Sequence, residues 1–149
     1  MAQSDIISAL QTINASVAGV RAAPTDFPGQ LNSSDLPMAL SYPERAVYGV
    51  YAVQGSQETR TWFVRVYVQP IAQGRSVDEG FTKTVVFVDR FRAEYQKLSN
   101  QRAADWWSTI QLVADSGVLA DLKLHNVGSI SYWGVEIELS IIVNHDLDA

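Results

Sequence analysis

The sequence predicts an α+β fold in which a mainly antiparallel sheet carries helices packed on one face. Three observations support this class. Residues 129–144 alternate between apolar and polar or small side chains, as a strand with one face on a core does. Residues 45–53 and 60–69 are rich in Val, Tyr and Trp and flank a short loop, as hairpin strands do. Residues 77–98 carry apolar side chains at helical spacing. The order of helix, strands, helix and strands is typical of α+β domains.

The N-terminal segment predicts a first helix. Ser4 can cap this helix, and Gly19 ends it. Its apolar residues share one face of a 3.6-residue period, and they are Ile6, Ile7, Leu10, Ile13 and Val17.

A connector at 24–37 follows, and it contains three prolines that oppose both helix and strand. Phe27, Leu31 and Leu36 are spaced through it. Loops of this length without secondary structure are usually functional or disordered. The three apolar residues favour a functional role, in which the connector acts as an extended arm that contacts an apolar surface.

Extended segments are predicted at 38–41, 45–53 and 60–69, with a hairpin loop at 54–58. In the last of these segments the even-numbered residues from Trp62 to Val68 form one face. The opposite face includes Phe63, Arg65 and Tyr67, and so it is not cleanly polar.

The second half of the chain predicts a long helix and further strands. Ser76 and Glu79 form a capping box, which indicates a helix over 77–98. A strand is expected at 107–113, whereas 115–126 fits either a helical turn or short extended pieces. In the final strand Trp133 faces the core, and Tyr132, Glu136 and Glu138 lie on the opposite face.

Composition limits the class of protein. The 149 residues suit a single domain, 1–149, with a short flexible tail expected at 145–149. A net charge of −5 argues against bulk nucleic-acid binding, and the absence of cysteine excludes thiol chemistry and Cys-ligated metals. The first residues lack the features of a signal peptide, and no run reaches the roughly 18 apolar residues of a membrane span.

Templates for catalysis are largely missing from the sequence. There is no P-loop and no G-x-S-x-G elbow. The two histidines, His125 and His145, are interpreted as a surface residue and part of a solvated tail. We therefore expect no catalytic residue, no metal and no cofactor.

The carboxylates Glu136 and Glu138 allow two interpretations. At i and i+2 on one strand they lie about 7 Å apart on one face, a spacing that could serve acid/base hydrolysis of a sugar. The favoured interpretation is a solvent face on which a carboxylate pairs with Arg65 of a neighbouring strand. The aromatic residues Phe63, Tyr67 and Tyr132 on the same side favour a protein partner.

Several segments resemble the tail terminator or tail-completion (neck) proteins of tailed bacteriophages. The likeness lies in IISALQTINASVAGV at 6–20, DLPMAL at 35–40, YPE at 42–44 and YWGVEIEL at 132–139. It covers most of the chain in order and length. Its motifs are apolar patterns around "LP" and "YWG" rather than a catalytic signature.

The resemblance implies a virion protein, assembled in the host cytoplasm, whose ring is usually hexameric. The ring would cap the tail tube, end tail polymerisation and meet the head-tail connector, with DNA only passing through its lumen. The expected partners are further copies of the chain, the tail tube protein and the head-tail connector protein, and no membrane. The candidate interface residues are Phe27, Leu31, Leu36, Phe63, Arg65, Tyr67, Tyr132, Glu136 and Glu138.

Two other classes remain open. One is a small-ligand or peptide-binding module that uses Phe63, Tyr67 and Tyr132 as a pocket wall. The other is an enzyme that uses Glu136 and Glu138, and it is the least favoured.

Overall fold

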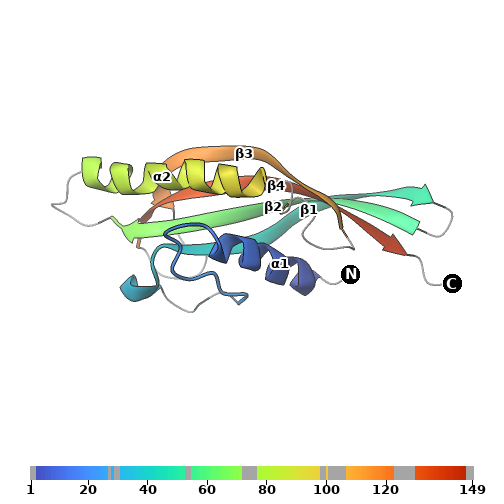
Figure 1. Ribbon diagram of the computed structural model, residues 1–149, viewed down its shortest axis with the longest axis horizontal. Helices are drawn as coiled ribbons and strands as arrows, with labels where there is room; N and C mark the ends of the chain where they lie inside the picture. Colours follow the sequence, from blue (N-terminus) through green and yellow to red (C-terminus); the bar gives the residue numbers. More distant parts are fainter. Residues whose placement is uncertain are drawn as a thin grey trace.

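A computed structural model describes residues 3–26, 28, 31–52, 55–71, 77–97, 100, 107–122 and 130–146. Within these residues two α-helices and a short 3-10 helix accompany a four-stranded antiparallel sheet (Figure 1). The α+β class is confirmed. The elements are α1 (Gln3–Ala15), η1 (Ser33–Asp35), β1 (Met38–Ala52), β2 (Gly55–Pro70), α2 (Val77–Tyr95), β3 (Trp107–Leu122) and β4 (Tyr132–Asp146).

The strands lie in the order β1-β2-β4-β3, so β1 and β3 form the edges of the described sheet. β1 is one strand, although the sequence predicted two segments separated at Pro43. A register shift between Pro43 and Ala46 absorbs the irregularity. Proline is tolerated in β1 because an edge strand needs hydrogen-bond donors on one side only.

β3 and α2 also differ from the predicted bounds. β3 runs to Leu122, so the ambiguous segment is extended up to that residue, with several register shifts against β4. α2 begins at Val77 and ends at Tyr95, whereas the predicted helix ran to residue 98, which lies outside the described residues.

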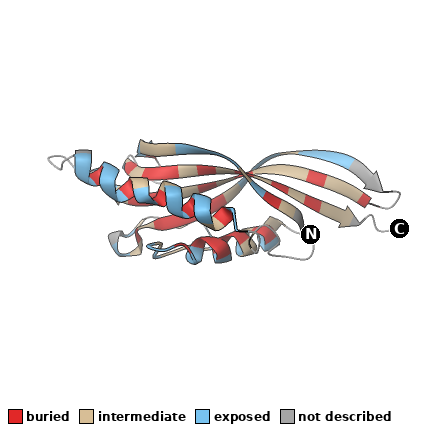
Figure 2. Ribbon diagram, turned by 45° about the horizontal axis from the view of Figure 1, so that its top comes forward, coloured by how far each residue is buried: buried red, intermediate tan, exposed pale blue. Residues whose placement is uncertain are grey.

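The main core lies between the helices and one face of the sheet. Buried residues of α1 and α2 pack there against the alternating residues of β2 and β4 that the sequence assigned to the core, Trp62 and Ile137 among them. Figure 2 shows buried and exposed positions interleaved along both helices, as expected for helices with one face on a core. Trp133 is half-buried and lies against Gly80 of α2.

A buried polar network fixes the two helices relative to the sheet. Asn14 donates to the side chains of Gln11 and Ser41, at 2.7 and 3.0 Å, and accepts from the Tyr95 hydroxyl at 2.5 Å. Gln11 also donates to the carbonyl of Ala39 at 2.8 Å. Buried polar groups are costly unless bonded, so this network specifies one docking arrangement of α1, α2 and β1.

Three strands continue past the ends of both helices (Figure 1). We call this end of the sheet the distal sheet and define it as residues 44–52, 55–60 and 141–146. Its inner part includes Ile141 and Val143, which are still buried in the main core and lie beside the start of β3. Because β4 continues to Asp146, the flexible tail predicted from residue 145 starts too early. His145 belongs to the strand rather than to a solvated terminus, because its ring bonds a buried side chain of β2.

Candidate interaction surface

Two of the aromatic residues predicted to face a partner are buried. Tyr67 and Tyr132 are 1% and 4% exposed and meet edge to face, with ring centroids 5.7 Å apart. They belong to a second apolar cluster with Met38, Leu40 and Leu122, on the sheet face opposite the helices. The interpretation of these two tyrosines as an exposed partner patch or pocket wall was wrong.

The connector covers the second apolar cluster, which contains Tyr67 and Tyr132. Arg21 N–H donates to the carbonyl of Pro37, and Ala22 forms a parallel bridge with Met38, which folds the connector back along β1. Leu36 is buried in the second cluster, and the partly buried Leu31 packs against it. Leu36 therefore contacts its own chain and is not available to a neighbouring subunit. Phe27 lies outside the described residues.

The remaining predicted interface residues are Phe63, Arg65, Glu136 and Glu138. Together with Tyr42, which was not predicted, they form a half-buried patch that we call the outer patch. The rings of Tyr42 and Phe63 stack with centroids 5.6 Å apart, and the Arg65 guanidinium lies 5.0 Å from the Tyr42 centroid. Arg65 also pairs with Glu136 at 2.7 Å, which confirms the predicted pairing of a carboxylate with the neighbouring strand.

Arg65 and Tyr42 both have pKa values above their usual ranges. Burial lowers the pKa of Arg65, but the hydrogen bond with Glu136 and the interactions with Tyr42 and Tyr67 together outweigh burial, so the net pKa lies above the usual value. Burial raises the pKa of Tyr42, the Arg65 charge lowers it, and the charge and hydrogen bond of Glu136 raise it, so the net pKa lies above the usual value. The Tyr42 hydroxyl stays neutral and donates to Glu136 at 3.1 Å.

Glu138 and Glu136 both line a small hollow of about 180 Å³, together with Phe63 and residues 114–116. No hydrogen bond or ion pair links Glu138 to another described side chain. The two carboxylates are thus unequal, since Glu136 is committed to Arg65. Both carboxylates line the hollow, and Glu136 is also held by its ion pair with Arg65, so the enzyme interpretation that uses the two carboxylates stays a prediction.

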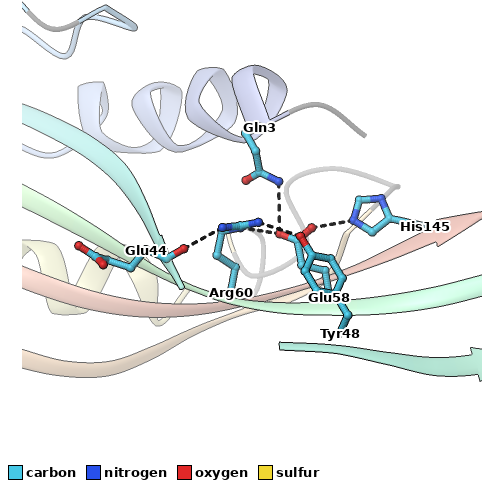
Figure 3. Close-up of polar contacts among 6 residues, drawn as sticks. All are labelled: Gln3, Glu44, Tyr48, Glu58, Arg60 and His145. Atoms are coloured by element: carbon cyan, nitrogen blue, oxygen red, sulfur yellow. Dashed lines mark hydrogen bonds and ion pairs between the residues drawn. The ribbon is translucent and has the colours of Figure 1, made fainter. Parts of the chain in front are cut away.

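A second cluster, in the distal sheet, was missed by sequence reasoning (Figure 3). Glu58 of β2 is 2% exposed. Its carboxylate accepts from Arg60 at 2.7 Å and from Gln3 of α1 at 3.2 Å, and its second oxygen lies 2.9 Å from His145 Nε2. Arg60 in turn donates to the carbonyl of Glu44 and the hydroxyl of Tyr48.

These contacts keep Glu58 ionised. Burial would raise the pKa of the carboxyl group, but the hydrogen bonds from Arg60, His145 and Gln3 outweigh burial, and the pKa lies below its ordinary value. A sequence signal existed, because Glu58 lies in phase with Trp62 and the other core residues of β2. Residues 54–58 were predicted to form a hairpin loop, so Glu58 was not considered as part of the strand.

The distal sheet also exposes large apolar side chains. Val47 is 62% exposed and Tyr48 61%. The register shift in β1 turns Tyr48 to the face that carries Glu58 and Arg60, and leaves Val47 on the other face. Both faces of the distal sheet therefore expose apolar surface that another protein could contact.

The described residues contain no group of three or more His, Asp or Glu side chains that could hold a metal ion. No helix in the described part of the chain combines the length and apolar character required to cross a bilayer. Neither a scan of known protein families nor a search of curated proteins found a match.

Proposed function

We propose that this protein is a structural virion subunit of a tailed bacteriophage, a tail terminator or tail-completion protein that acts in the neck as a ring. The distal sheet is the observation that carries the proposal. Three strands project past the helices with Val47 and Tyr48 exposed, while the buried Glu58 cluster holds them in place. A domain that works alone gains little from a rigid apolar projection, whereas an assembling subunit needs one.

The geometry of a ring also suits the sheet. β1 and β3 are its edges, and edge strands present unpaired backbone groups that favour pairing with another chain. A head-to-tail contact between unlike surfaces of successive copies closes into a ring when the rotation is right. The segments at 6–20, 35–44 and 132–139, which resemble the phage family, supply α1, the start of β1 and the start of β4.

The ring is proposed to be a hexamer that ends tail-tube growth and meets the head-tail connector protein. Its acidic balance of −5 would let DNA pass through the lumen without binding. The outer patch contains the predicted interface residues that are still accessible to a partner, and within the described part of the chain Glu138 is its carboxylate without an ion pair. The particle would assemble in the host cytoplasm and remain in the virion.

The substitution Val47→Lys tests the assembling role of the distal sheet. We expect the variant to fold like the wild type, because Val47 is largely exposed, but to need at least about 10-fold more protein to assemble, because a charge enters an apolar contact. Sedimentation velocity across a concentration series measures this shift. Phe81→Lys, on the half-exposed face of α2, is the matched control and should assemble normally. Normal assembly of the Val47→Lys variant would show that the distal sheet is not part of the interface between subunits.

A further inference from the structure

A groove lies at the end of the sheet opposite the distal sheet, between α2, the last residues of β2 and the connector. It encloses about 480 Å³. Its apolar walls include Leu36, Val68 and Phe87, which are buried, and Val86, which is 39% exposed. A volume of this size accommodates a few amino-acid residues.

Three cationic side chains, Arg21, Lys83 and Arg90, line the same groove, and none of the residues that line it is acidic. The chain as a whole carries a charge of −5, so the groove is opposite in sign to the rest of the molecule. Such a local reversal favours an anionic occupant.

The three cations differ in how they are held. Arg90 donates to the carbonyl of Ala18 at 3.0 Å and lies 5.3 Å from the centre of the Phe87 ring. Gly19, at φ +89, permits this approach, since a Cβ there would lie 2.6 Å from Arg90. Lys83 makes an exposed ion pair with Glu79, which is weak and easily exchanged. No hydrogen bond or ion pair links the Arg21 side chain to another described residue.

We propose that this groove binds an acidic peptide segment of a partner protein, with an apolar side chain on its floor and its carboxylates at Arg21 and Lys83. The apolar side chains of the groove favour a protein over a nucleic acid as the partner. Nucleic-acid phosphates need cations on a polar, hydrated surface, whereas Val86, which is 39% exposed in the groove, gains from burial against a hydrocarbon side chain. The proposal does not rest on the tail-tube function, because a single copy of the chain carries the complete groove.

The test is selection from a display library of random dodecapeptides on immobilised wild-type protein. Counter-selection uses the variant Arg21→Glu/Lys83→Glu, whose changed residues are both exposed. We expect enriched peptides with several Asp or Glu residues around at least one apolar residue. The strongest peptide, synthesised with a fluorescent label, should lose at least 10-fold in affinity on the double variant. Its binding should also weaken as salt is raised.

The matched control is Arg45→Glu/Lys97→Glu, which makes the same change in net charge at exposed cations outside the groove. This variant should bind the peptide as the wild type does. An equal loss of peptide affinity in both double variants would show a long-range charge effect and would overturn the proposal that the groove is the binding site. Enrichment of neutral or basic peptides, no enrichment over the counter-selecting variant, or tighter binding of an oligodeoxythymidine of equal charge would also overturn it.

Discussion

At the scale of single residues, Glu58 explains how the distal sheet keeps one geometry. An ionised carboxylate that is 2% exposed is tolerated here because Arg60, Gln3 and His145 all bond it. These partners come from β2, α1 and β4 (Figure 3). One side chain therefore ties the first residues of the chain to the last described strand.

The substitution Glu58→Gln tests this tie. At pH 7 we expect the free energy of unfolding to fall by about 1–3 kcal/mol, because charge-assisted bonds are lost in a buried site. Chemical denaturation measures the change. Glu44→Gln is the control, because the Glu44 side chain is exposed and its backbone carbonyl is the group that accepts from Arg60. An equal loss in both variants would contradict the assigned role.

Glu58 also makes the stability of the folded protein depend on pH. The folded pKa of Glu58 lies below the ordinary value of 4.5, so its contribution to stability is complete above that value and is lost as pH falls through the folded pKa. We expect the wild type to lose stability on acidification below about pH 4.5, and Glu58→Gln to show a shallower decrease. Urea titrations at pH 3, 4, 5 and 7 resolve the two slopes. Parallel curves would be inconsistent with an ionised Glu58.

At the scale of elements, the register between β2 and β4 depends on Gly134. A Cβ built at this position would lie 2.3 Å from the backbone oxygen of Val66 and 2.5 Å from Leu122. Backbone of a central strand cannot move without disturbing its ladder, so the position requires glycine for space.

Gly134→Ala should therefore destabilise the protein by about 1–3 kcal/mol or more, as overpacking in a core does. Gly49→Ala is the matched control in β1, because a Cβ there meets nothing within 4 Å. Thermal unfolding of both variants gives the comparison. A melting temperature for Gly134→Ala equal to that of Gly49→Ala would show that the strands can separate there at no cost.

Sequence patterns predicted several features of the fold correctly. The alternation around Trp62 and Ile137 identified the core face, and the capping box located the start of α2. The pairing of Arg65 with Glu136 followed from strands that share a face. The first two features depend on neighbours at fixed spacing along the chain, and the third depends on alternation within two strands that lie side by side.

The remaining features depend on contacts distant in sequence. Tyr67 and Tyr132 are buried because the connector folds back over its own sheet, and alternation cannot reveal that path. Pro43 suggested a break, but the edge position of β1 tolerates it. Glu58 was assigned to a loop because polar residues surround it in the sequence, and two of its three bonding partners, Gln3 and His145, lie 55 and 87 residues away.

At the scale of the whole molecule, the candidate contact surfaces lie apart from one another. The distal sheet carries exposed Val47 and Tyr48, and the cationic groove lies at the other end, among α2, β2 and the connector. The outer patch lies between them on the sheet face that the connector leaves uncovered. Separate surfaces of this kind let one subunit contact like copies and a different partner at once.

Electron microscopy of the purified full chain tests the ring directly. The account predicts closed rings with a central channel and a mass of about 98 kDa, six chains of 16.4 kDa each. Particles of one or two chains, or open filaments in place of closed rings, at concentrations well above those of assembly in the cell, would contradict it.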